Sequence, residues 1–559
     1  MTDVATRTSV DDLADRFWEG FLERQPLFAS FIGDRRYEDR LDDPGPVGRQ
    51  REIAALREIR TAAADIDAGS LGQEDRITLS MLQVVADIGL AQHEQGLHEF
   101  AGVDHIAGPQ TLPGDIARFS QVDSPEAFER LLARVGAYGS YLDAYMGNLQ
   151  DGRRSGRTAA RIVVERAIEQ TQRTVAMPTD ESPLLVAIEG LDDDQRARLG
   201  EVIDDEVRPA QERYLAALRE YLPHARQGEG LWAIPDGDQA YRTAILASVT
   251  FQASAQELHD YGLEQMERIN EERLEIAGEL GHHDVASLRK ALETDPDNFA
   301  ATPERLAEIA REQIERAPPP APEYFDRLPG AACEVRRVEA YMEQEAPAAY
   351  YFPPPADGSR NGIYYINTYK PEARPLHQLA AVTYHEAVPG HHFQCTIETE
   401  LVGLHAFRRF GARMVGAAYS EGWGLYSERL ADEMGLFLDS RERLGMLDMQ
   451  AMRAARLVVD TGLHAFRWDR TRSVDYMESA GLPRLQAEVE VDRYIAWPGQ
   501  ALSYMTGQRE IMALRRELEQ RDGDRFDLKA FHDAVLAHGS LTLATLRSEL
   551  PGWVQPKQA

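Results

Sequence analysis

The chain has 559 residues, and its 61 Lys and Arg residues against 93 Asp and Glu residues give a formal net charge of −32. Nucleic acids and anionic membrane surfaces would repel such an acidic protein, so we expect neither as a partner. Hydrophobic residues make up 43% and charged residues 28%, which is typical of a folded globular protein and excludes overall disorder.

Helical periodicity of apolar residues begins at residues 10–24 and recurs along the chain. Ser124 and Thr302 are each followed by Pro and then Glu, which predicts that a helix starts at each of them. Further helical patterns cover residues 159–174, 195–221, 254–278, 421–468, 508–520 and 527–537. No linker clearly divides the chain, so we expect a mainly α protein built as one unit over residues 1–559.

Residues 333–369 have a different pattern from the rest of the chain. They hold short β-branched and aromatic runs, including Tyr350 to Phe352 and Gly362 to Ile366, bounded by Pro and Gly. This pattern is typical of strands, and we expect a small antiparallel sheet immediately before a helix that starts near Pro375. A purely structural hairpin is the simpler interpretation of the same residues.

The cellular compartment is indicated by the two cysteines, Cys333 and Cys395, and by the hydrophobic pattern. Two cysteines cannot form a disulfide scaffold in a chain of this length, which fits a reducing cytosol. Residues 1–21 lack the basic region and the apolar run of a signal peptide, and no stretch approaches 18 uncharged apolar residues. We therefore expect a cytoplasmic protein.

The most informative segment is residues 383–393, in which His385 and Glu386 are followed by two further histidines, His391 and His392. In zinc-binding helices, two histidines one turn apart bind the metal, and a Glu beside the first activates water. On a regular helix, six residues rotate the chain by about 600° and seven advance it by about 10.5 Å. Neither His391 nor His392 would then share an ion with His385.

Pro389 and Gly390 resolve this geometric difficulty. Proline removes a backbone donor and clashes with the carbonyl group four residues earlier, so a helix cannot continue straight through it. Glycine supplies the freedom to loop out two residues. We therefore interpret the pair as a bulge in one helix that brings His391 next to His385, with His392 as the alternative ligand. A histidine satisfied inside the core remains the simpler explanation for any single one of them.

A third ligand is expected on a neighbouring helix. Glu421 lies 30 residues after His391, and the small residues Ser420, Gly422 and Gly424 around it would let two helices approach closely. The alternative for Glu421 is a surface position near a helix start, favoured by the helix dipole. Glu428, two turns later, is the alternative ligand or a partner of a ligand histidine.

Two imidazoles and one carboxylate suit a single Zn²⁺ ion per chain, because they leave a fourth position for water. The ion lowers the pKa of that water toward about 7, and Glu386 can take the proton and later pass it to a leaving amine. We place the catalytic helices within residues 375–510.

The motifs resemble those of a bacterial family known as domain of unknown function 885, grouped with the gluzincin metallopeptidases. The motifs that carry this resemblance are residues 33–37, 362–367, 385–392, 419–423, 459–464 and 493–504. The resemblance implies a large helical gluzincin-like fold with a deep channel and an edge strand that holds the substrate. Angiotensin-converting enzyme, thimet-type oligopeptidases and Taq-type carboxypeptidases are its relatives.

The resemblance also implies a tyrosine late in the chain that hydrogen-bonds the developing oxyanion. Tyr504 is the first choice for this role and Tyr494 the second, with a core aromatic position as the alternative for each. His464 is a candidate catalytic residue, oriented by Asp460 four residues earlier, although a structural Asp–His pair explains the spacing nearly as well.

Substrate contacts are expected at two places. Arg453, Arg456 and Arg493 are candidates to bind the C-terminal carboxylate of a substrate, although arginines on a solvated surface would show the same pattern. Residues 362–369 are the candidate edge strand along which a peptide aligns, and Asn367 would orient that peptide.

These expectations together predict a zinc-dependent hydrolase that cleaves peptide bonds in small peptides. One alternative is a zinc amidase that acts on a non-peptide metabolite amide, because the same catalytic residues would serve it. The other is a non-catalytic helical binding protein with a vestigial metal site. Glu386 argues against this last alternative, because a structural site needs no base beside a ligand.

Overall fold

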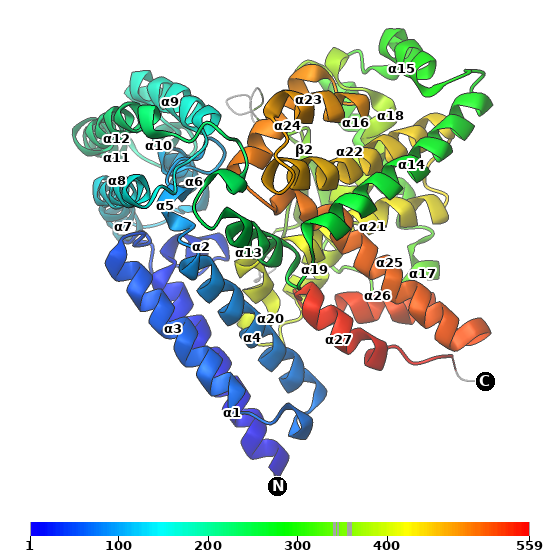
Figure 1. Cartoon of the computed structure of the whole chain (residues 1–559), viewed down its shortest axis with the longest axis horizontal. Coiled ribbons are helices and arrows are strands. Elements are labelled where there is room, and N and C mark those ends of the chain that lie inside the picture. The colour runs from blue at the N-terminus through cyan, green and yellow to red at the C-terminus, as the bar shows by residue number, and fades with distance from the viewer. Residues whose placement is uncertain (1, 339–342, 344–345, 355–359, 558–559) are drawn as a thin grey trace. The chain divides into compact units, whose positions relative to one another are not determined.

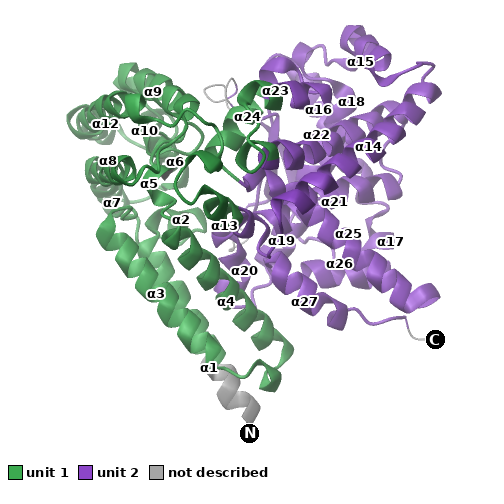
Figure 2. Ribbon diagram, viewed as in Figure 1, with its two compact units in different colours: residues 1–244, 462–473, 488–498 green, residues 245–461, 474–487, 499–559 purple. Residues whose placement is uncertain are grey.

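The computed structural model describes residues 2–338, 343, 346–354 and 360–557, and the described chain is mainly helical (Figure 1). Its contacts form two compact units, where the sequence led us to expect one (Figure 2). Unit 1 comprises residues 1–244, 462–473 and 488–498, and unit 2 comprises residues 245–461, 474–487 and 499–559. The chain passes between the units several times, which explains why no single linker marks the boundary in the sequence.

Unit 1 is helical. Its α-helices are α1 (Thr2–Arg24), α2 (Pro26–Phe31), α3 (Pro46–Ala64), α4 (Gln73–Glu94), α5 (His98–Ala101), α6 (Leu112–Phe119), α7 (Pro125–Gly136), α8 (Tyr138–Ser155), α9 (Arg161–Ala176), α10 (Pro183–Val186), α11 (Asp193–Val202) and α12 (Arg208–Tyr221). Helix α3 packs against α4 and α1, and α12 packs against α8 and α9. Apolar stripes such as that of α1, which buries Val10, Leu13 and Phe17, form these contacts.

Unit 2 contains the sheet and a second set of helices. They are α14 (Ala255–Glu279), α15 (Val285–Thr294), α16 (Pro303–Arg316), α17 (Ala321–Tyr324), α18 (Leu376–Glu386), α19 (His391–Glu400), α20 (Ala406–Phe410), α21 (Ala418–Glu433), α25 (Ser503–Asp522), α26 (Leu528–Leu536) and α27 (Leu543–Trp553). Residues of both units occur in α13 (Gly237–Val249), α22 (Ser440–His464), α23 (Arg470–Ser479) and α24 (Arg484–Ala496). None of the helices within the described residues has the length and apolar character that crossing a membrane requires.

The two predicted helix starts are confirmed. The Ser124 hydroxyl accepts a hydrogen bond from the Ala127 N–H at the start of α7, and the Thr302 hydroxyl accepts one from the Arg305 N–H at the start of α16. In each case the side chain satisfies a backbone donor that the first turn of a helix leaves free. The local sequence therefore determines these boundaries.

The small sheet is present, but its predicted strand arrangement is wrong. Strands β1 (Cys333–Arg337), β2 (Ala349–Phe352) and β3 (Gly362–Ile366) lie in the order β1-β3-β2. Strand β3 pairs antiparallel with β2 and parallel with β1, so the sheet is mixed instead of antiparallel. The prediction that residues 362–369 form an edge strand is also wrong, because β3 has a partner on both sides and cannot add a peptide there.

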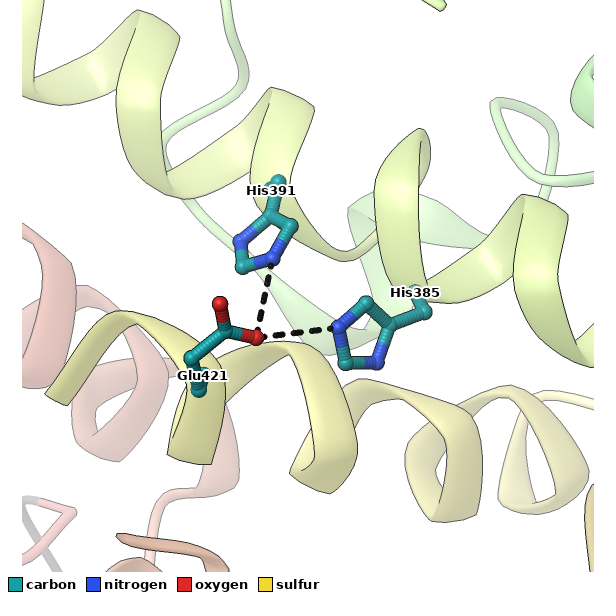
Figure 3. A group of neighbouring side chains, drawn as sticks. All are labelled: His385, His391 and Glu421. Carbon is teal, nitrogen blue, oxygen red and sulfur yellow. Dashed lines mark ion pairs between the residues drawn. The ribbon is translucent and has the colours of Figure 1, made fainter. Parts of the chain in front are cut away.

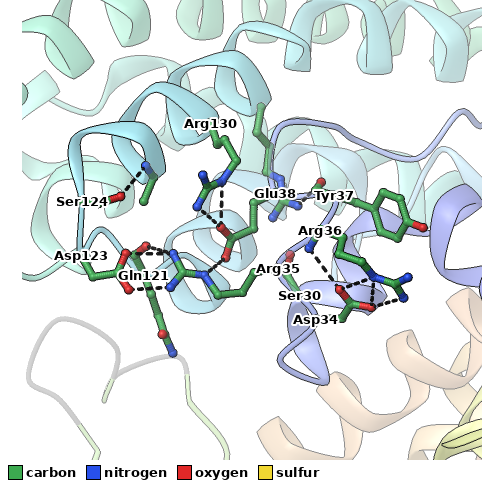
Figure 4. Close-up of polar contacts among 12 residues, drawn as sticks. Ser30, Asp34, Arg35, Arg36, Tyr37, Glu38, Gln121, Asp123, Ser124 and Arg130 are labelled. Atoms are coloured by element: carbon green, nitrogen blue, oxygen red, sulfur yellow. Dashed lines mark hydrogen bonds and ion pairs between the residues drawn. The ribbon is translucent and has the colours of Figure 1, made fainter.

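The segment after α2 is held by a cluster of ion pairs in unit 1 (Figure 4). The Glu38 side chain is buried and contacts Arg35 at 2.9 Å and Arg130 at 3.2 Å. Arg35 also contacts Asp123 at 2.6 Å, which ties the segment to the start of α7. This cluster explains the run of charged residues at positions 34–38, which the sequence alone associated only with a family motif.

A Glu38→Gln substitution should lower the stability of unit 1 by about 1–2 kcal/mol, because two partly exposed guanidinium groups lose their shared carboxylate. The neighbouring exposed ion pair between Arg36 and Asp34 provides the control, and Arg36→Gln should cost no more than about 0.5 kcal/mol. Thermal unfolding of the two variants measures the difference. Equal melting temperatures for them would contradict a structural role for Glu38.

Candidate metal centre

The predicted metal-binding motif spans two helices. Helix α18 ends at Glu386 and α19 begins at His391, so the expected bulge within one helix is instead a complete break. Pro389 lies inside the break, and a Cβ on Gly390 would lie only 1.9 Å from the His385 carbonyl oxygen. Glycine is therefore required at the point where the chain turns back toward the end of α18.

The break brings His385 and His391 together, and Glu421 faces both of them from α21 (Figure 3). The imidazole rings lie 4.8 Å apart between centroids and are perpendicular. Glu421 Oε2 lies 3.4 Å from His385 Nε2 and 3.6 Å from His391 Nε2. The three residues proposed from the sequence thus form one cluster.

The spacing of this cluster fits a tetrahedral zinc ion. Ligand atoms about 2.0–2.1 Å from a tetrahedral ion lie about 3.3 Å from one another. Two of the three donor pairs are at 3.4 and 3.6 Å, and all three donor atoms lie within 4.8 Å of one another. His391 and Glu421 remain partly exposed, with side-chain accessibilities of 13% and 21%, so one side of the cluster is open to water or a substrate.

The hydrogen bond on the far side of His385 also fits a metal. His385 Nδ1 donates a hydrogen bond of 2.9 Å to Glu428 Oε1, so Nε2, which faces Glu421, is the nitrogen that could bind an ion. Burial lowers the pKa of His385, but the contacts with Glu421 and Glu428 outweigh it and raise the pKa to about 9. Burial raises the pKa of Glu421, but its contacts with His385 and His391 outweigh burial and hold the pKa well below the ordinary value.

Glu428 contacts His385 and lies outside the cluster of His385, His391 and Glu421, the position that its second predicted role requires. Its side chain is fully buried, and its second oxygen accepts a hydrogen bond of 2.9 Å from Gln450 on α22. Gln508 on α25 donates in turn to Gln450 Oε1 at 2.9 Å. His385 is therefore oriented by a chain of buried side chains that spans three helices.

Glycines in α21 let this helix pack closely against His385 and against α25. A Cβ on Gly424 would lie 2.8 Å from the His385 ring, and a Cβ on Gly422 would lie 2.5 Å from Gly507 in α25. Both distances are below any normal contact of a Cβ atom. The small residues around Glu421 thus have the function predicted from the sequence, because α21 packs closely on α18 and α25.

A second polar chain lies behind His391. The Ser420 hydroxyl lies 3.5 Å from His391 Nδ1 and donates to Gln394 Oε1 at 3.1 Å. Gln394 donates to Glu398 at 2.6 Å, and the buried Glu398 pairs with Arg413 at 2.8 Å. In both histidines, polar side chains thus lie next to Nδ1, the ring nitrogen that does not face Glu421.

His392 does not belong to the cluster, so the alternative ligand assignment is wrong. Its Nδ1 lies 2.9 Å from the Tyr351 hydroxyl and 3.2 Å from the Thr396 hydroxyl. Burial lowers the pKa of His392 to about 4. Adjacent residues at a helix start point in directions about 100° apart, so only one of the two histidines can face Glu421.

Glu386 ends α18 next to the ligand His385 and is only partly buried. Burial raises the pKa of its carboxyl group above the ordinary value, although the charges of His391 and His385 act in the opposite direction. Within the described part of the chain, its carboxylate accepts no hydrogen bond, and it is therefore available to a water molecule.

The two candidate tyrosines differ in what their hydroxyl groups contact. Tyr494 in unit 1 is buried and donates a hydrogen bond of 2.7 Å to Glu490. Tyr504 in unit 2 makes no hydrogen bond through its hydroxyl within the residues that the structure describes, and its ring lies under the guanidinium group of Arg456 at 4.6 Å. Tyr504 is thus the candidate whose hydroxyl is free.

The structure gives His464 a structural position, contrary to its predicted catalytic role. It is fully buried in unit 1, where its Nδ1 accepts a hydrogen bond from the Leu231 N–H at 3.1 Å and its Nε2 donates to the Tyr494 carbonyl at 3.0 Å. Burial lowers its pKa to about 3. Asp460 accepts hydrogen bonds from the Gly499 N–H, which fixes the turn before α25.

Two of the proposed substrate contacts also change. Asn367 is fully buried, and its amide donates to the carbonyl oxygens of Glu343 and Ala346, so it holds a loop and cannot orient a peptide. Arg493 lies in unit 1, where it stacks on Trp497 and pairs with Glu490 at 3.8 Å. Both were predicted from motif position alone, which does not determine where a side chain points.

The sequence analysis missed the residues behind the ligands, chiefly Gln394, Glu398, Gln450 and Gln508. Helix α22 is buried over most of its length, but it also carries charged residues such as Arg443, Asp448 and Arg453, so its sequence did not mark Gln450 as buried. A polar residue inside such a helix needs a partner. The other three lie on amphipathic helices, where a polar residue is expected on the surface.

The comparisons with known proteins agree with this fold. A family model described as "Bacterial protein of unknown function (DUF885)" matches residues 26–550. A crystal structure of "the putative lipoprotein from Colwellia psychrerythraea" is 26% identical, covers 98% of this chain and 99% of its own, and has a TM-score of 0.90. No curated protein matches the chain.

A second solved structure, described as "a putative lipoprotein of unknown function from Shewanella oneidensis", is similar in fold. It is 19% identical, covers 96% of this chain and 98% of its own, and has a TM-score of 0.75. The cytoplasmic location expected from the sequence stays a prediction. The match over residues 26–550 shows that the chain belongs to the DUF885 family of bacterial proteins.

Proposed function

We propose that the protein is a gluzincin-like zinc metallopeptidase that hydrolyses peptide bonds in small peptides. The observation that carries this proposal is the joint position of His385, His391 and Glu421 around one point, with Glu386 beside the first ligand. A structural metal site has no use for a partly buried carboxylate next to its ligand, and the partial exposure of His391 and Glu421 gives water access to the cluster.

In this proposal His385, His391 and Glu421 hold one zinc ion. When bound, zinc acts as a Lewis acid that polarises a carbonyl group and makes water more acidic. Glu386 takes a proton from the attacking water and passes it to the leaving amine, a role that suits a carboxylate whose pKa is raised by burial. Tyr504, with its free hydroxyl, donates a hydrogen bond to the developing oxyanion.

Glu428 and Gln450 contribute by position. The hydrogen bond from His385 Nδ1 to Glu428 fixes the tautomer and the ring orientation of the ligand. Because the imidazole is held before any ion arrives, little side-chain entropy is lost on binding. The deep channel implied by the resemblance, which would limit substrates to short peptides, stays a prediction.

The choice between the two adjacent histidines can be tested by metal content. His391→Gln should lower zinc affinity by more than about 100-fold, because a direct ligand is lost. His392→Gln should leave one zinc per chain, since His392 faces Tyr351. Elemental analysis after dialysis against limiting zinc measures both. Loss of zinc only in the His392 variant would reverse the assignment.

A Glu386 variant should separate an effect on catalysis from an effect on metal binding. Glu386→Gln should retain zinc but lower kcat by about 10²–10⁴-fold on a small-peptide library, because the general base is lost. The exposed residue Glu517 on α25 provides the control, and Glu517→Gln should behave like the wild type. Hydrolysis that is unchanged in the Glu386 variant would remove this residue from the mechanism.

The close packing at Gly424 makes a separate prediction. Gly424→Ala would place a methyl group 2.8 Å from the His385 ring, so the ring must move and zinc affinity should fall by about 10–100-fold. Gly278 on α14 has open space at its Cβ position, and Gly278→Ala should leave affinity unchanged. Competition with a chromophoric chelator measures both. Equal zinc affinities of the Gly424 and Gly278 variants would mean that α18 and α21 move apart without displacing His385.

A further inference from the structure

Arg453 is a buried cation without a carboxylate partner. Its side chain, on α22, is only 8% exposed, yet within the described residues it forms no ion pair. Its Nη1 contacts only the Met449 carbonyl and sulfur, at 3.4 and 3.1 Å, and its Nε is buried without a hydrogen-bond partner. The guanidinium group therefore has donors that the protein itself does not use.

The buried Arg408 and Arg409 of unit 2 donate hydrogen bonds of 2.7 Å to backbone carbonyls, and two further arginines of unit 2 pair with carboxylates. Arg273 contacts Asp448 at 2.6 Å, and Arg413 contacts Glu398 at 2.8 Å. Burying a cation is unfavourable unless an anion approaches it, so such pairs are the normal arrangement. Arg453 departs from it, which indicates that its anion comes from outside the chain.

The position of Arg453 connects it to the metal centre. It lies three residues after Gln450, on the same face of α22, and Gln450 supports Glu428 behind the ligand His385. An anion bound by Arg453 would thus lie near the side chains that hold His385 in place.

Tyr504 forms part of the same surroundings. Its ring lies 5.9 Å from the Arg453 guanidinium carbon and 4.6 Å from that of Arg456. Tyr504 lies one turn before Gln508, and Gln508 is hydrogen-bonded to Gln450. Two cations and the free phenol hydroxyl therefore lie together, one helical turn away from the side chains that orient His385.

We propose that Arg453 binds the C-terminal carboxylate of the peptide substrate, so that the protein removes residues from the C-terminal end. A guanidinium group with free donors matches a carboxylate better than any neutral group. A carboxylate held this close to the candidate metal centre belongs to the residue next to the cleaved bond, which is the C-terminal residue of the peptide. The inference rests on the proposed peptidase function and adds the cleavage mode.

The test uses one library of N-acetylated tetrapeptides, prepared with free C-terminal carboxylates and again as C-terminal amides. The zinc-loaded wild type should prefer the free acids by about 10–100-fold in kcat/KM, the range of a charged hydrogen bond. Arg453→Gln should abolish this preference, mainly by raising KM for the acids, and Arg453→Lys should keep part of it. Arg516→Gln, at an exposed position on α25, should behave like the wild type.

The ratio of acid to amide hydrolysis within one preparation does not depend on how much of a variant is folded. Equal hydrolysis of both libraries by the wild type would overturn the inference and leave the peptidase function standing. An equal loss on both libraries in Arg453→Gln would also overturn it, because the arginine would then act only on Glu386. Cleavage of amides only where they carry Asp or Glu would assign Arg453 to an acidic side chain. No cleavage of either library by the zinc-loaded wild type would end both proposals.

Discussion

The buried hydrogen bond from His385 to Glu428 is the interaction on which the candidate site depends. It fixes one ligand nitrogen as a donor to a carboxylate and so leaves the other available to a metal. Gln450 donates to the remaining oxygen of Glu428, Gln508 donates to Gln450, and this chain connects α18, α21, α22 and α25. Because a partly satisfied buried network is unfavourable, these helices are constrained to one relative arrangement.

Close packing makes that network possible. Glycines at positions 422, 424 and 507 bring α21 near both α18 and α25, to distances that a side chain would prevent. The same closeness places Glu421 opposite His385 and His391. The ligand geometry is therefore a consequence of helix packing in unit 2, and the ion would enter a cluster whose side chains are already oriented.

The charge distribution around the cluster has a chemical consequence. Glu421 and Glu428 contact the two histidines, whereas Glu386 follows His385 in the sequence and accepts no hydrogen bond within the described chain. Within the described residues, Arg453 and Tyr504 have donors without a strong partner, and our proposals use these donors to bind an anionic or developing negative group.

The sequence by itself determined the helix starts at Ser124 and Thr302, the existence of strands within residues 333–366, and the residue types of the metal cluster. These depend on local chemistry: caps, the proline break and the pairing of His with Glu. The tertiary structure alone decided that His391 faces Glu421 while His392 faces Tyr351, that β3 lies between two partners, and that His464 and Asn367 are enclosed. Each of these depends on contacts between residues far apart in the chain, which periodicity and spacing do not encode.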